Sequence, residues 1–79
     1  MTIEDAINDL TAKSKSISSG AIFKVVKVSE EEARLSVYVP GEHVEPIREA
    51  TREQAVKLIV EGLDVQIFVY DKAENPPPD

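Results

Sequence analysis

The sequence predicts an α+β domain, a two-layer sandwich in which two helices cover one face of a three-stranded sheet, in the order α-β-β-α-β. Two stretches repeat apolar side chains at helical spacing, and three others are rich in β-branched residues or alternate apolar with polar ones. The 79 residues suffice for one hydrophobic core but not for two. We therefore expect one domain over residues 1–72 with a mixed or antiparallel sheet, followed by a disordered, proline-rich tail over residues 73–79.

The first helix is expected over residues 2–13. Its apolar side chains recur at helical spacing and comprise Ile3, Ala6, Ile7 and Leu10. Thr2 and Asp5 match a capping box, which marks the N-terminal end of a helix. Residues 14–20 contain four serines and are expected to end the helix and to link it to the sheet.

Two strands of a hairpin are expected over residues 21–28 and 34–39, with an acidic turn over residues 29–32. The first strand is rich in β-branched side chains. The second alternates cleanly between apolar and polar side chains, so that one of its faces is suited to the core.

The second helix is expected to begin at Thr51, because Thr51 and Gln54 match a capping box, and to end at Gly62. Residues 40–50 lack a periodic pattern and are expected to form a loop. The third strand is expected over residues 63–70. The inward face of the last two strands is then apolar and consists of Leu35, Val37, Val39, Val65, Ile67 and Val69.

Because both helices are expected on one face of the sheet, its other face is left open. If residues 29–32 form a four-residue turn, Phe23 lies opposite Tyr38 and Lys27 lies opposite Arg34. This register turns Lys24 toward the core, a cost that a bulge or an edge position would relieve. The open face then carries the four aromatic rings of the chain and two cations, namely Phe23, Lys27, Arg34, Tyr38, Phe68 and Tyr70. Exposed aromatic surface of this kind is usually covered by another molecule.

The composition narrows the function classes. Nine Lys and Arg residues against fifteen Asp and Glu residues give a net charge of −6, which disfavours binding to duplex nucleic acid. The chain has no cysteine, which removes disulfides, thiolate nucleophiles and cysteine-based metal sites. It also has no apolar run long enough to span a membrane and no signal-peptide pattern, so we expect a cytoplasmic protein without membrane contact.

Motifs for catalysis or cofactor binding are missing from the sequence. The three glycines stand too far apart for a phosphate-binding loop, and no serine lies in a nucleophile-elbow pattern. His43 is the single histidine and is expected to be a solvated loop residue. Arg48 and Arg52 flank the expected start of the second helix and are candidates for contacting an anion there, although neighbouring glutamates would neutralise them. We therefore expect no enzyme activity, no cofactor and no metal.

The order of the elements resembles that of small RNA-associated folds related to the type II KH domain. The G-x-x-G loop with which that family clamps a nucleotide backbone is missing, since the glycines stand at positions 20, 41 and 62. The resemblance therefore concerns the order of the elements alone.

These features predict a small, acidic, non-enzymatic interaction protein, of the kind common in bacteria and their phages, that self-associates through the aromatic open face as a homodimer or larger homo-oligomer. The loop over residues 40–50 is the expected place for another protein or a small ligand. A second hypothesis is a module that stacks a nucleotide or single-stranded nucleic acid on Tyr38, Phe68 and Tyr70. A third is an acidic inhibitor that meets a basic partner with the carboxylates of residues 30–32 and 42–53.

Overall fold

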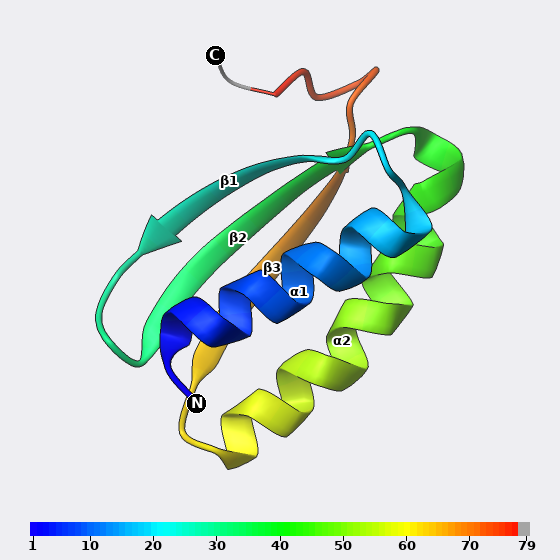
Figure 1. The fold of residues 1–79 in the computed structure, drawn as a ribbon. Coiled ribbons are helices and arrows are strands. Elements are labelled where there is room, and N and C mark those ends of the chain that lie inside the picture. The colour runs from blue at the N-terminus through cyan, green and yellow to red at the C-terminus, as the bar shows by residue number, and fades with distance from the viewer. Residues whose placement is uncertain (78–79) are drawn as a thin grey trace.

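The computed structural model describes residues 1–77 as two helices and a three-stranded mixed sheet (Figure 1). The elements in chain order are α1 (Ile3–Ile17), β1 (Ile22–Lys27), β2 (Glu32–Val39), the 3-10 turn η1 (Gly41–His43), α2 (Val44–Val60) and β3 (Asp64–Asp71). The strand order is β1-β2-β3, with β1 antiparallel and β3 parallel to β2. The predicted α+β fold with the order α-β-β-α-β is confirmed, and both helices lie on the same side of the sheet.

The core lies between the sheet and the two helices. The central strand β2 contributes Ala33, Leu35, Val37 and Val39, none of which has exposed surface. α1 contributes the four apolar side chains that its spacing predicts, and all of them are buried. Of the predicted inward side chains, only Ile67 is half-buried; it lines a groove between β3 and α2.

α1 is longer than the sequence predicts. The capping box at Thr2 and Asp5 is confirmed, but the helix continues to Ile17 instead of ending at residue 13. The hydroxyl of Ser14 is buried and donates to the carbonyl oxygen of Leu10 at 2.9 Å. This bond satisfies the buried hydroxyl inside the helix, so the serine-rich segment continues the helix where it was expected to break it.

α2 begins at Val44, so the prediction of a loop over residues 40–50 is wrong. Pro46 lies in the first turn of the helix, where its missing N–H is not needed. Thr51 is inside the helix, fully buried, and its hydroxyl donates to the carbonyl oxygen of Ile47 at 2.7 Å. The match of Thr51 to a capping box was therefore coincidental.

The C-terminal end of α2 is the one predicted. Gly62 has a φ angle of 85°, a conformation that glycine adopts without steric cost. Its N–H donates to the carbonyl oxygen of Ile59, and the N–H of Leu63 donates to that of Leu58, both at 2.9 Å. These two bonds make a Schellman motif, which turns the chain from the helix into β3.

The hairpin between β1 and β2 differs from the prediction by one residue. The N–H of Val28 donates to the carbonyl oxygen of Glu32 at 2.9 Å, so the turn contains three residues, 29–31, instead of four. Phe23 consequently pairs with Val37, and Lys27 pairs with Ala33. Since the side chains of a strand alternate between faces, this single step moves every side chain of β1 to the face opposite the predicted one.

The chain after β3 begins with a turn. The backbone N–H groups of Glu74 and Asn75 both donate to the carbonyl oxygen of Asp71, at 3.1 and 2.8 Å. The N–H of Ala73 donates to the Asp71 side chain at 2.9 Å. The predicted disordered tail, residues 73–79, also includes Pro78 and Asp79, which lie outside the described residues.

Candidate functional site

The face of the sheet turned away from the helices is the candidate functional surface, and we call it the open face. It is built from alternate residues of all three strands. Its side chains are Ile22, Lys24 and Val26 from β1, Glu32, Arg34, Ser36 and Tyr38 from β2, and Asp64, Gln66, Phe68 and Tyr70 from β3.

Four of the six side chains predicted for this surface lie on it, namely Arg34, Tyr38, Phe68 and Tyr70. Phe23 and Lys27 do not, because the three-residue turn places them on the helix side. Phe23 is half-buried against the core. The places predicted for these two residues are therefore wrong.

The predicted four-residue turn directed Ile22, Lys24 and Val26 toward the helices, so the predicted surface did not include these three open-face residues. One signal pointed to them. The four-residue turn required Lys24 to face the core, whereas the three-residue turn leaves its ammonium group in solvent.

The open face has an aromatic end. Tyr38 and Tyr70 pair across β2 and β3, and their rings stack with centroids 5.2 Å apart and an interplanar angle of 23°. Each ring therefore covers one face of the other. Beside them Phe68 is 42% exposed, and across the sheet Ile22 is 44% and Val26 is 45% exposed. These large apolar side chains remain in contact with water although the rest of the chain is folded around its core.

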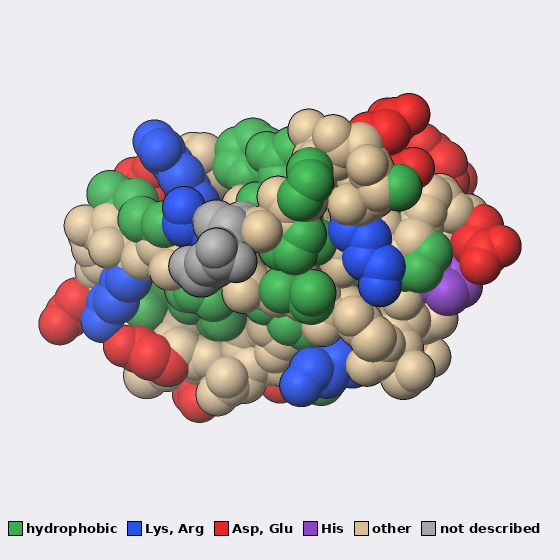
Figure 2. Space-filling view, turned by 90° about the horizontal axis from the view of Figure 1, so that it is seen from above, with side chains coloured by type: hydrophobic (Ala, Val, Ile, Leu, Met, Phe, Trp, Pro, Cys, Tyr) green, Lys and Arg blue, Asp and Glu red, His purple; other side chains and the backbone are tan. Residues whose placement is uncertain are grey.

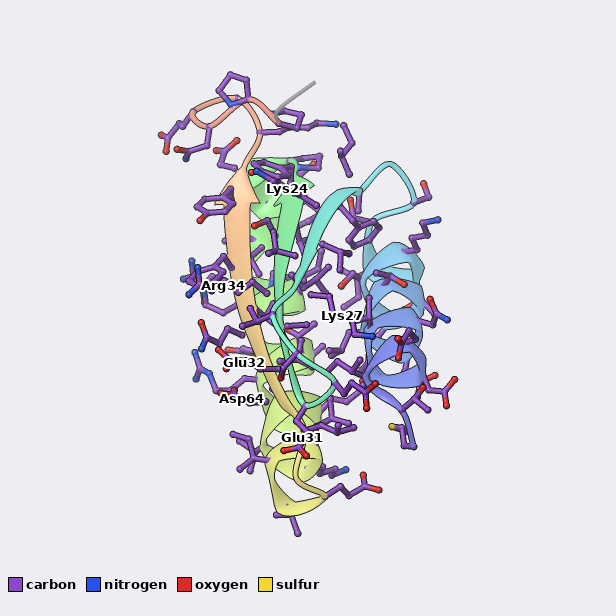
Figure 3. All side chains as sticks on the ribbon, turned by 90° about the vertical axis from the view of Figure 1, so that its left-hand side faces the viewer. Lys24, Lys27, Glu31, Glu32, Arg34 and Asp64 are labelled. Atoms are coloured by element: carbon purple, nitrogen blue, oxygen red, sulfur yellow. The ribbon has the colours of Figure 1, made fainter. Side chains whose placement is uncertain are left out.

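The charges of the open face balance. Lys24 and Arg34 are its two cations, and Glu32 and Asp64, which pair across β2 and β3, are its two carboxylates (Figure 3). The chain as a whole has a net charge of −6. The open face is thus less negative than the rest of the surface, so a second negatively charged protein is repelled less strongly there.

Lys27 is bound on the helix side of the sheet. Figure 3 shows it extending toward α1, where its Nζ lies 2.7 Å from Oε1 of Glu4. The hydrogen bond from Lys27 lowers the pKa of the Glu4 carboxyl below its ordinary value, and it raises the pKa of Lys27. The ion pair connects β1 to the first turn of α1.

This ion pair predicts a dependence of stability on pH. The Glu4 contribution is present above its ordinary pKa of 4.5 and is lost as the pH falls through the lowered pKa. The Lys27 contribution is present below its ordinary pKa of 10.5 and is lost as the pH rises through the raised one. In an NMR titration of the Glu4 carboxyl carbon, Lys27→Met should raise the midpoint. Lys24→Met, on the opposite face, should leave it unchanged, and equal effects of the two variants would contradict the pairing.

Arg48 and Arg52 do not flank the start of α2, because the helix begins at Val44. The expected site with free helix N–H groups is therefore not formed around them. Both arginines instead line a groove of about 330 Å³ together with Thr51, Ala55, Ile67 and Val69. Arg48 is bound to Glu45, with 2.7 Å between Nη1 and Oε1. The structure thus brings the two predicted anion-binding residues together over an apolar floor.

His43 is half-buried and not solvated as predicted. Its Nδ1 shares a hydrogen bond of 2.9 Å with the hydroxyl of Ser18, which is only 3% exposed. The bond connects η1 to the residue that ends α1. The single histidine is the purple side chain in Figure 2, beside acidic side chains at one end of the molecule. We interpret this contact as a structural link between two elements.

No protein-family model, curated protein or solved structure matches the chain. Within residues 1–77, no group of three or more histidine or acidic side chains is arranged to hold a metal ion. Neither helix of the described chain combines the length and the apolarity that crossing a membrane requires.

Proposed function

We propose that this protein is a non-enzymatic interaction module that associates with a second copy of itself through the open face. The observation that carries the proposal is the exposure of Ile22, Val26 and Phe68, each above 40%, on a face that no element within residues 1–77 covers. Large apolar side chains that share one uncovered face of a small domain are typical of a binding site. A chain of this length also buries a comparatively small fraction of its surface, so association adds burial that the monomer lacks.

The charges favour a second copy as the occupant. An open face that carries both signs in equal number can meet its own two-fold-related copy with opposite charges opposed. Elsewhere the net charge of −6 makes two copies repel each other. The open face is therefore where self-association meets the least electrostatic resistance.

The area of the open face sets the expected strength of self-association. Two strands of eight residues and one of six, about 4.8 Å apart and with a rise of about 3.3 Å per residue, present roughly 350 Å² in projection. A standard interface contributes about 800 Å² from each partner, so the pair should be weak and reversible, with a dissociation constant in the micromolar range or above.

The aromatic rings are less suited to stacking a planar ligand. Because Tyr38 and Tyr70 stack on each other, one face of each ring is already occupied. A nucleotide would then have only the outer ring faces and the half-exposed Phe68 to stack on. This arrangement favours protein association over a nucleotide platform.

Sedimentation over a concentration series tests the proposal. The weight-average mass of the wild-type chain should rise from monomer toward dimer between about 10 and 500 μM, as expected for a small interface. Phe68→Ser should keep the chain monomeric over the same range. Val60→Ser serves as a matched control, because Val60 is 85% exposed but lies on α2, away from the open face.

Two outcomes would overturn self-association through this face. One is a wild-type chain that stays monomeric at the highest concentration. The other is equal loss of assembly in Phe68→Ser and Val60→Ser. In the first case, a rise in melting temperature with a nucleotide, abolished by Tyr38→Ala, would establish the stacking function in its place.

A further inference from the structure

The outer edge of β3 has no partner strand in the part of the chain that the structure describes. There β3 pairs only with β2, and the N–H of Asp64 donates to the carbonyl oxygen of Glu31 at 2.7 Å. Backbone groups alternate in direction along a strand, so even-numbered residues of β3 bond to β2 and odd-numbered ones face away. The N–H and C=O groups of Val65, Ile67 and Val69 therefore point to the free edge.

This edge lacks the features that usually protect a sheet from added strands. The charged residues of β3, Asp64 and Asp71, stand at its two ends, and residues 65–70 between them include no charged residue and no proline. The opposite edge strand, β1, carries Lys24 and Lys27. Within the described chain, the only residue with a positive φ is Gly62, which precedes β3, so no left-handed bulge residue interrupts the strand. The outer edge of β3 is therefore the more receptive of the two.

A groove runs beside this edge. α1 packs against one flank of α2 (Figure 1), where Lys13 of α1 lies near Gln54 and Leu58. The groove of about 330 Å³ lies on the other flank, between α2 and β3. Ile67 and Val69 supply its apolar floor, and the side chains of Arg48 and Arg52 line it from the helix.

The groove is cationic. Arg48 is paired with Glu45, but Arg52 forms no ion pair within residues 1–77. The Thr51 hydroxyl is already bound to a backbone carbonyl. The guanidinium group of Arg52 lies next to the outward-facing backbone groups of β3. The site therefore favours an extended segment whose backbone pairs with β3 and whose carboxylates bind the arginine.

We propose that the outer edge of β3 binds an extended acidic segment of a partner protein, which adds to the sheet as a fourth strand. Alternate side chains of the added strand face the helix layer, where carboxylates meet Arg52 and Arg48. The other side chains face the open side next to Phe68, where apolar residues fit. The recognised pattern is therefore an alternation of acidic and apolar residues.

A second copy of this chain is a poor occupant of the same edge. Its own β3 would present Val65, Ile67 and Val69 toward the groove instead of carboxylates. The pairing would also bring the arginine-bearing flanks of two α2 helices together, and like charges in an interface are unfavourable. This site is therefore distinct from the open face.

The test is an NMR titration of the ¹⁵N-labelled full chain with a blocked hexapeptide in which glutamate alternates with valine. The amide signals of Val65, Ile67 and Val69 should shift and become protected from hydrogen exchange. A peptide with lysine in place of glutamate should have no such effect. Arg52→Glu should weaken binding of the glutamate peptide about tenfold, as expected when one charge-assisted contact is replaced by repulsion.

Lys57→Glu is the matched control, because it changes the net charge by the same amount on the other flank of α2. It should alter the affinity for the glutamate peptide by less than about twofold, because salt screens exposed charges on the far flank of α2. Equal effects of Arg52→Glu and Lys57→Glu would overturn the proposal, as would equal binding of the two peptides. Shifts confined to open-face residues, or no binding of the glutamate peptide at millimolar concentration, would also overturn it. Repeating the titration with Val26→Ser, a change on the open face at the opposite edge strand β1, separates this site from self-association.

Discussion

Replacing Ile47 by alanine is expected to lower the free energy of unfolding by about 3 kcal/mol. Ile47 is fully buried in the core and lies in the segment that the sequence predicts to be a loop. The substitution removes three methyl or methylene groups from a close-packed site and leaves a cavity behind. A domain of this size has a total stability of about 4–12 kcal/mol, so the loss is a large fraction of it.

Urea denaturation of Ile47→Ala and Ile59→Ala would measure this effect. Ile59 lies on the same helix but is 60% exposed, so its replacement should change stability by less than about 0.5 kcal/mol. The melting temperature of Ile47→Ala should fall by roughly 15 °C for a chain of this length. If both variants remain within about 0.5 kcal/mol of the wild type, residues 44–50 do not pack as the first turns of α2.

Replacing Phe23 by alanine is expected to lower the free energy of unfolding by about 2 kcal/mol. The loss is smaller than for a fully buried ring because Phe23 is half-buried. Its ring packs against the core, and the Lys15 ammonium lies 5.9 Å from the ring centroid. Phe68→Ala is the matched control, because Phe68 is the other phenylalanine and lies on the opposite face of the sheet. Its replacement should cost less than about 1 kcal/mol.

This comparison tests the hairpin register directly. It should be made at a protein concentration at which the wild-type chain is monomeric, so that the Phe68 variant reports on the fold alone. A three-residue turn places the two rings on opposite faces, whereas the predicted four-residue turn places them together on the open face. Equal losses of stability would therefore support the four-residue turn and contradict the pairing of Phe23 with Val37.

The two proposed surfaces meet at β3. Phe68 belongs to the open face, and the unpaired backbone groups of its neighbours Ile67 and Val69 form part of the outer edge. Since the faces and the edges of a strand are separate, a second copy and an acidic segment can bind at once. The open face would set the oligomeric state, and the edge would select the partner.

Local physical chemistry in the sequence was enough to predict the order of the elements and most of the core. The capping box of Thr2 and Asp5 involves only residues three apart in the chain, so it could be assigned without the fold, whereas the similar match at Thr51 and Gln54 lies inside α2. Gly62 at the end of α2 is a similar case, because a positive φ angle excludes most other residues. The alternation of apolar and polar side chains along β2 identified the buried face of that strand, because alternation depends only on neighbouring residues.

Only the tertiary structure decided the register of β1, the start of α2 and the groove at Arg48 and Arg52. A turn of three residues or of four can join β1 to β2. The length of the turn depends on whether Phe23 or Lys24 packs against core residues that are distant in the chain. The first turns of α2 are held by the burial of Ile47, which no local pattern around Pro46 indicates. The two arginines meet Ile67 and Val69 because β3 pairs beside β2, and a contact between segments so far apart in the chain is determined by packing, not by local sequence.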